Sequence, residues 1–237
     1  MTRRRWIADE VSGDRAALTG VHADHLTRVL RAHVGQEFDI VANGVLHRGQ
    51  IATISDARVE FDLGEEIPAE AAPAQITLVL AIFKFDRMEW AIEKCTELGV
   101  ERMIPVIARR TDSHLASASV KRVERWRRIA LQASEQSRRA APPEISEPIK
   151  LRDTLALPAK LKLVLSEAED RSQLRDIPAH TAGEVLLAIG PEGGWTKDEL
   201  EQFRINGWTS VSLGPTILRA ETAAIAATAI ATSALVR

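Results

Sequence analysis

The stretch that decides the fold is Val185-Leu186-Leu187-Ala188-Ile189-Gly190-Pro191-Glu192-Gly193-Gly194-Trp195-Thr196-Lys197-Asp198-Glu199-Leu200. Its first five residues are apolar, a pattern typical of a strand buried in a parallel sheet. The chain then breaks at Gly190–Gly194, and Thr196 with Glu199 three residues later predicts a capping box that starts a helix. A buried strand, a glycine turn and a helix N-terminus commonly hold a ligand in α/β domains. A plain strand-to-helix turn explains the stretch equally well.

This turn does not match either of the common phosphate-binding motifs. No Gly-Lys-Ser/Thr follows it, and its glycine spacing differs from the dinucleotide fingerprint. The stretch therefore indicates a ligand loop without identifying the ligand.

The chain around this stretch alternates between strand and helix patterns. We expect strands at residues 76–82, 102–107, 162–165, 185–189 and 209–213, and helices at 87–98, 120–139, 196–205 and 219–235. In the helix at 120–139, Val123, Trp126, Ala130 and Ala133 fall on the inward side. This alternation predicts an α/β fold with a parallel sheet covered on both faces.

The first part of the chain has a different pattern. It predicts strands at 3–7, 37–41, 45–51 and 59–63, with Asn43-Gly44 as a hairpin turn. Residues 23–31 predict a short amphipathic helix with Leu26, Val29 and Leu30 on its apolar side. These short elements favour a small β-barrel. The Pro- and Ala-rich linker at 67–74 places the boundary between a domain of residues 1–70 and one of residues 71–237.

Composition excludes several classes of protein and site. The single cysteine, Cys95, excludes an internal disulfide and a cysteine-based zinc site, and its neighbours on the predicted helix indicate a small core residue. The six histidines have no ligand spacing, so we expect no metal. The first residues do not resemble a signal peptide, and Ala223–Val236 is typical of a packed helix. We therefore expect a cytoplasmic protein without membrane contact.

Charge is unevenly distributed along the chain. Residues 1–72 contain 8 Arg or Lys against 12 Asp or Glu, whereas residues 101–140 contain 10 against 4. A locally basic segment in a chain of net charge −2 suggests a confined nucleic-acid footprint. For charge alone, a solvated helix face is the simpler explanation.

A second glycine turn follows at Ser212-Leu213-Gly214-Pro215-Thr216-Ile217-Leu218-Arg219-Ala220-Glu221-Thr222-Ala223. Two Gly-Pro turns at the ends of buried strands can form two walls of one pocket. Backbone groups and apolar side chains in such walls suit an adenine and a ribose better than a triphosphate.

These two turns resemble the RsmE-type family of ribosomal RNA (uracil-N3) methyltransferases, a branch of the SPOUT superfamily. The similarity extends to His25–Arg31, to Lys84–Trp90 with Lys94 and Glu97–Val100, and to Glu135–Arg138. Trp195 stands where the family has Phe. The resemblance implies a C-terminal domain with a deep trefoil knot, a PUA-like RNA-binding barrel at residues 1–70, and a homodimer.

The resemblance also implies S-adenosylmethionine as cofactor, held by the two turns and by a third strand exit at Leu165–Glu167. The cofactor-binding residues expected from it are Leu165, Ser166, Glu167, Ile189, Gly190, Pro191, Glu192, Gly193, Gly194, Ser212, Leu213, Gly214, Ile217, Leu218, Arg219, Thr222 and Ala223.

The implied reaction is methylation of N3 of a uridine in small-subunit (16S) ribosomal RNA, with the free RNA or the assembled 30S subunit as partner. The neutral N3 nitrogen is a poor nucleophile, so the enzyme needs a base and a donor to the developing negative charge. The candidates on matching motifs are Glu135, Arg138, Arg219 and Glu221. Expected RNA contacts are Arg28, Arg31, Lys84, Arg122, Arg125, Arg128 and Arg139. A ribose 2′-O methyltransferase and a non-catalytic ribosome-assembly protein are the alternatives.

Overall fold

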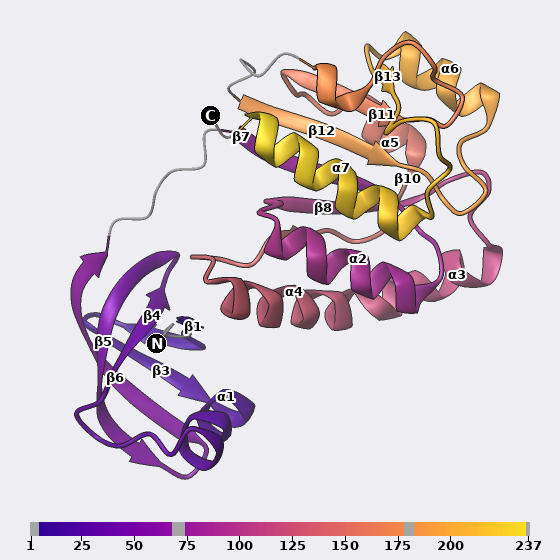
Figure 1. Cartoon of the computed structure of the whole chain (residues 1–237). Helices are drawn as coiled ribbons and strands as arrows, with labels where there is room; N and C mark the ends of the chain where they lie inside the picture. Colours follow the sequence, from indigo (N-terminus) through magenta and orange to yellow (C-terminus); the bar gives the residue numbers. More distant parts are fainter. Residues whose placement is uncertain (1–4, 68–73, 178–182, 236–237) are drawn as a thin grey trace. The chain divides into compact units, whose positions relative to one another are not determined.

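The computed structural model describes residues 5–67, 74–177 and 183–235 (Figure 1). The chain divides into two compact units, one of residues 1–71 with 134–141 and the other of residues 72–133 with 142–237. The linker expected at 67–74 lies almost wholly outside the described residues.

The first unit is a curled, mainly antiparallel sheet (Figure 1). Its strands follow the order β1-β4-β5-β6-β3-β2, and β1 and β4 are the one parallel pair among those described. The strands are β1 (Arg5–Ile7), β2 (Glu10–Ser12), β3 (Arg15–Thr19), β4 (Glu37–Ala42), β5 (Val45–Ser55) and β6 (Arg58–Ile67). The predicted hairpin is confirmed, because Asn43 and Gly44 join β4 to β5 with φ of 52° and 80°. The hairpin of β2 and β3 was not predicted from the sequence.

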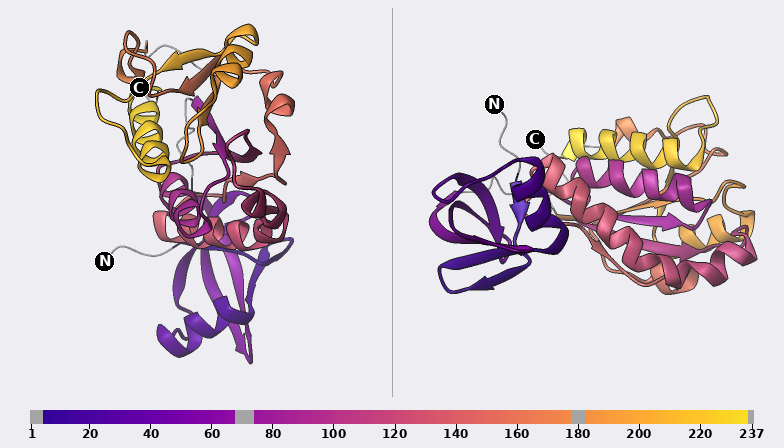
Figure 2. Two further views of the ribbon diagram at one scale, coloured as in Figure 1. Left: turned by 90° about the vertical axis from the view of Figure 1, so that its right-hand side faces the viewer. Right: turned by 90° about the horizontal axis from the view of Figure 1, so that it is seen from below.

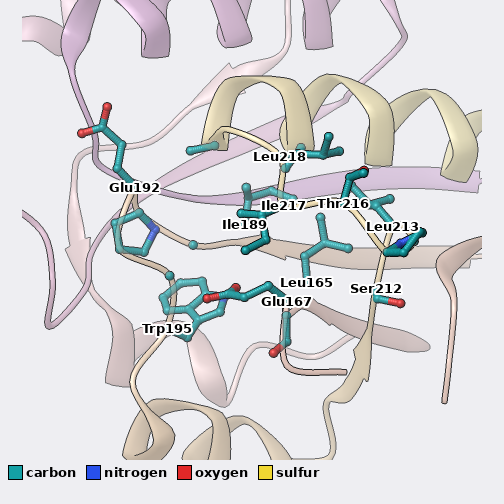
Figure 3. A pocket seen from close by; sticks show the side chains of 18 residues that line it. Leu165, Glu167, Ile189, Glu192, Trp195, Ser212, Leu213, Thr216, Ile217 and Leu218 are labelled. Atoms are coloured by element: carbon teal, nitrogen blue, oxygen red, sulfur yellow. The ribbon is translucent and has the colours of Figure 1, made fainter. Parts of the chain in front are cut away.

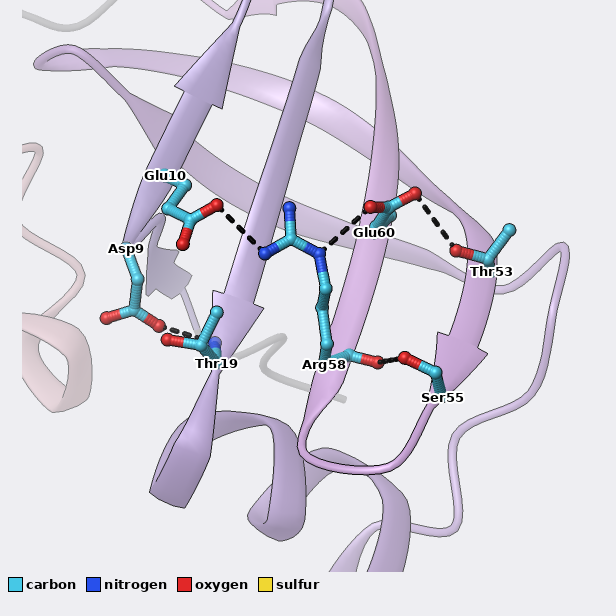
Figure 4. Close-up of polar contacts among 7 residues, drawn as sticks. All are labelled: Asp9, Glu10, Thr19, Thr53, Ser55, Arg58 and Glu60. Carbon is cyan, nitrogen blue, oxygen red and sulfur yellow. Dashed lines mark hydrogen bonds and ion pairs between the residues drawn. The ribbon is translucent and has the colours of Figure 1, made fainter.

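A polar network on this sheet ties the missed hairpin to the longer strands (Figure 4). Arg58 donates to Glu10 at 2.8 Å and to Glu60 at 2.9 Å, and Thr53 donates to Glu60 at 3.1 Å. The hydrogen bonds from Arg58 and then Thr53 lower the pKa of the Glu60 carboxyl. These cross-strand contacts therefore link three strands, β2, β6 and β5, with Arg58 reaching Glu10 across the intervening strand β3.

The helix expected at 23–31 is wrong in its bounds and its apolar face. An α-helix, α1 (Gly20–Asp24), precedes a π-helical turn, η1 (His25–Val29). Leu26 is buried, but Val29 and Leu30 are 64% and 46% exposed. A π-turn holds more residues per turn than an α-helix, so a spacing of 3.6 residues does not keep these side chains on one face. Arg31, with φ of 51°, follows the turn.

The second unit is built on a parallel sheet of order β10-β8-β7-β12-β11-β13, with β9 beside β8. Every described strand pair in it is parallel, which confirms the predicted α/β class. The strands are β7 (Ala74–Ala81), β8 (Arg102–Ile107), β9 (Glu144–Ile145), β10 (Ile149–Lys150), β11 (Leu161–Leu165), β12 (Gly183–Ile189) and β13 (Thr209–Val211). The apolar runs in the sequence correspond to strands that are buried on both faces.

Two separate cores cover the faces of this sheet. Helices α2 (Phe85–Glu97), α4 (Val123–Ser137) and α7 (Ala220–Leu235) lie on one face, side by side in Figure 2. On the other face are α5 (Leu151–Leu155) and α6 (Lys197–Ile205), with Trp195 and Trp208. The predicted inward residues of α4, Val123, Trp126, Ala130 and Ala133, are buried. Cys95 is also fully buried in the first of these cores, as predicted.

Several predicted bounds in this unit need correction. The helix expected at 120–139 is two elements, the 3₁₀ turn η2 (Ser119–Arg122) and α4, and they follow a helix that was not predicted, α3 (Ser113–Ala118). Helix α4 ends at Ser137 because Arg138 adopts a left-handed φ of 62°, before Pro142 is reached. Strand β13 ends at Val211, two residues earlier than expected. The short 3₁₀ turn η3 (Leu174–Asp176) was not predicted. Across the described ranges, no helix has the length and hydropathy needed to cross a membrane.

Candidate functional site

Three strands of the parallel sheet end at one pocket (Figure 3). Strand β11 lies between β12 and β13 in parallel register, so the chain leaves all three at the same sheet edge. The first turn of α7 closes the pocket. The lining residues are Leu165, Ser166, Glu167, Ile189, Gly190, Pro191, Glu192, Gly194, Trp195, Ser212, Leu213, Gly214, Pro215, Thr216, Ile217, Leu218, Ala220 and Ala223.

Most residues that we expected at a cofactor site lie in this lining. The exceptions are Gly193, Arg219 and Thr222, which belong to the same loops but do not line the pocket. Four lining residues were not among those expected, namely Trp195, Pro215, Thr216 and Ala220. Their positions inside or next to the two glycine turns are the signal that could have identified them.

The glycine turn has a backbone that favours glycine. Gly194 has φ of 68°, and its N–H donates to the Pro191 carbonyl at 2.8 Å. The predicted capping box is present, since Thr196 Oγ1 accepts from Glu199 N at 3.2 Å and Thr196 N donates to Glu199 Oε2 at 2.8 Å. Arg109 N also donates to Glu199 Oε1 at 2.7 Å, which ties the chain after β8 to the helix start. This geometry holds the turn open toward the pocket.

The pocket lining is acidic and apolar. It contains the carboxylates of Glu167 and Glu192, but none of its residues is a Lys, Arg or His. Nε1 of Trp195 is buried without a hydrogen-bond acceptor in the described part of the chain. A pocket of this composition suits an uncharged or cationic ligand with apolar surface.

The four candidate catalytic residues fall in two different units. Arg219 is exposed beside the pocket, whereas the side chain of Glu221 is 5% exposed and lies 3.7 Å from Arg87 Nε. Glu135 and Arg138 belong to the segment that groups with the first unit. There, Glu135 Oε1 lies 3.6 Å from His22 Nε2, and the Arg138 carbonyl accepts from Arg5.

The expected RNA contacts also divide between the units. In the first unit, Arg28 is exposed and 3.3 Å from Asp24, Arg31 is exposed, and Arg139 Nε donates to the Ala141 carbonyl.

In the second unit, Lys84 and Arg128 are exposed. Arg125 forms a two-pronged bond with Glu89 at 2.7 and 2.8 Å, and Arg122 lies over the Phe85 ring at 4.8 Å. Arg122 is in η2, not in the central helix where we expected it.

Comparisons with known proteins agree with this architecture. Residues 70–232 match the model of the RNA methyltransferase domain. The chain is 34% identical over 213 residues to ribosomal RNA small subunit methyltransferase E of Rickettsia conorii, covering 88% of this chain and 85% of the relative. It is 29% identical to the protein of the same name from Aquifex aeolicus, covering 86% and 88%.

The same relationship holds for a solved structure. The ribosomal RNA small subunit methyltransferase E of Neisseria gonorrhoeae, crystallised bound to S-adenosyl methionine, superposes with a TM-score of 0.87 at 30% identity and covers 99% of this chain and 98% of its own. The chain belongs to the ribosomal RNA small subunit methyltransferase E family of RNA methyltransferases.

Proposed function

We propose that this chain transfers a methyl group from S-adenosylmethionine to N3 of a uridine in small-subunit ribosomal RNA. The observation that carries the proposal is the pocket at the ends of β11, β12 and β13, in a chain of this family. Its relative from Neisseria gonorrhoeae was solved bound to S-adenosyl methionine.

The residues present fit this cofactor. The pocket offers carboxylates and no cationic side chain, which suits a ligand with a sulfonium charge. Gly214, which has no atom within 4 Å of its missing Cβ, leaves room for close approach of backbone to a ribose or an adenine. The unpaired N–H of Trp195 would be a donor to a ligand atom. When bound, S-adenosylmethionine supplies an electrophilic methyl group on sulfur.

The chain's own residues have to activate the uridine. Arg219, exposed beside the pocket, is our candidate for stabilising the negative charge that develops on a uracil oxygen when N3 loses its proton. Glu135 is the candidate base and Arg138 a candidate phosphate contact. Glu221 is a second candidate base, and its carboxylate is buried like that of Glu135 and faces Arg87.

We also propose the finer architecture that the family resemblance implies. The C-terminal segment would form a trefoil knot in the part of the chain that leaves the outer strand β13 and packs α7 on the central strands β7 and β12. The curled first sheet would be a PUA-like barrel that binds RNA, and the enzyme would be a cytoplasmic homodimer.

Nucleoside mass spectrometry of small-subunit ribosomal RNA from cells with and without this protein tests the function. We expect 3-methyluridine to disappear without the protein. Loss of a 2′-O-methyl nucleoside instead would point to ribose methylation. If the protein also failed to bind S-adenosylmethionine in calorimetry, a non-catalytic role in ribosome assembly would replace the proposal.

A further inference from the structure

Arg87 connects two walls of the pocket without lining it. It lies in the first turn of α2, and its Nη1 donates to Glu192 Oε1 at 2.8 Å. Its Nε lies 3.7 Å from Oε1 of Glu221. Glu192 is in the glycine turn, and Glu221 is in the first turn of α7, next to the lining residue Ala220. One guanidinium therefore extends from the turn to the helix that closes the pocket.

Burial explains why Arg87 stays in this position. The Glu221 side chain is 5% exposed, and its Oε2 has no hydrogen-bond partner among the described residues. A buried carboxylate requires a compensating charge, which Arg87 provides. The Arg87 side chain itself is 30% exposed and that of Glu192 is 38% exposed, so the Glu221 end is the anchored one.

Glu192 is the one side chain in the turn that can be held by hydrogen bonds, because the rest of Gly190–Gly194 is glycine and proline. A guanidinium is planar and its donors have fixed directions, so the hydrogen bond to Glu192 sets the position of that carboxylate relative to Arg87, while the 3.7 Å ion pair with Glu221 holds the guanidinium near the start of α7. A lysine ammonium carries the charge without that geometry.

We propose that Arg87 is a positioning residue that holds the Gly190–Gly194 turn against the start of α7 and thereby sets the pocket for its ligand. This inference rests on the proposed function for the identity of the ligand, S-adenosylmethionine.

Calorimetry of the full chain with S-adenosylmethionine and with S-adenosylhomocysteine tests the proposal. The two ligands share the adenosyl and amino-acid parts, but the second lacks the sulfonium charge. We expect Arg87→Met to weaken both by a similar factor of roughly tenfold, about 1.4 kcal/mol. Unchanged affinities, or a tighter S-adenosylmethionine complex caused by the lost cation, would overturn a positioning role.

Matched variants distinguish a loss of affinity caused by a displaced glycine turn from one caused by general destabilisation of the protein. Arg204→Met removes an arginine that bonds both carboxylate oxygens of Glu201 on α6, outside the pocket lining, and should leave both affinities unchanged. Glu192→Gln should weaken both ligands, and combining it with Arg87→Met should add little. If Arg87→Met alone unfolds the protein, the double variant Arg87→Met with Glu221→Gln replaces it, because the second change removes the buried charge that the first leaves uncompensated.

Hydrogen exchange of the ligand-free protein keeps the proposal testable without the cofactor. Arg87→Met should speed exchange of the Gly194 amide, which bonds to the Pro191 carbonyl, and Arg204→Met should not. Equal protection in both variants would contradict the inference. A wild-type protein that does not bind S-adenosylmethionine would instead contradict the proposed function.

Discussion

The Glu167 carboxylate occupies the space that a side chain at Gly194 would need, and so joins the end of β11 to the turn after β12. Gly194 also has a left-handed φ of 68°. Two features favour a glycine here, the backbone conformation and the position of a neighbouring carboxylate.

Gly194→Ala should destabilise the protein by about 1–2 kcal/mol, because L-residues are strained at this φ. The Glu167 carboxylate is the flexible end of its side chain and will move aside, so the ligand should bind more weakly as well. Urea unfolding and calorimetry measure the two effects. Gly207→Ala is the control, since Gly207 has φ of 78° and no atom near its missing Cβ. It should lose similar stability and keep its affinity, and equal affinity losses would refute the role of Glu167.

Removal of the buried Glu199 carboxylate should lower the free energy of unfolding more than removal of the Thr196 capping bond. Thr196→Ala removes one capping bond and should cost about 1 kcal/mol. Glu199→Ala leaves the N–H groups of Arg109 and Thr196 without their charged acceptor and should cost about 2–3 kcal/mol. Urea unfolding compares the two variants, and equal losses would show that the bond from Arg109 contributes nothing.

Cys95 should make stability fall at alkaline pH. Burial raises the pKa of its thiol from 9.0 to about 12, while the hydrogen bond from Thr228 opposes this more weakly. Below pH 9 the thiol is neutral in both states and stability is unaffected. Between pH 9 and 12 the unfolded chain alone ionises, so stability should decline by about 1.4 kcal/mol per pH unit.

Comparing the pH dependence of unfolding for the wild type and Cys95→Ala isolates this contribution. The variant should have a shallower alkaline slope. Identical slopes would mean that the thiol ionises in the folded protein as it does in the unfolded chain.

Arg28 and Arg31 should contribute to the salt dependence of RNA binding if the first unit holds phosphates. Replacing both with Ala should reduce the slope of log K against log salt by about 1.5–2, because each lost phosphate contact releases fewer counterions. Filter binding to small-subunit ribosomal RNA measures the slope.

The matched pair for this test is Arg15→Ala with Arg48→Ala, two arginines of the same unit that face Asp62 at 3.1 Å and Asp39 at 3.2 Å. Their removal should leave the slope nearly unchanged. If both double variants behaved alike, net charge and not a specific contact would explain binding.

The features predicted correctly from the sequence are those that depend on residues close together in the chain. The hairpin at Asn43-Gly44 and the capping box of Thr196 and Glu199 depend on residues within four positions of each other. The prediction for residues 23–31 was wrong because the chain forms a π-turn there, and the apolar spacing in the sequence does not distinguish a π-turn from an α-helix. Arg122 and Arg125 look like free cations in sequence, yet both lie close to Glu89 in the fold.

The sequence alone was enough to predict the parallel sheet, since continuous apolar runs have to be buried on both faces, and to locate the two glycine turns that follow β12 and β13. How those turns are held depends on the folded chain. Arg87 and Glu192 are 105 residues apart in the chain, and their contact exists because α2 packs on the sheet that contains β12. Ion pairs between distant residues depend on the final positions of whole elements, and sequence spacing carries no information about them. The role of Glu192, a lone charge in a glycine turn, therefore became visible only in the folded chain.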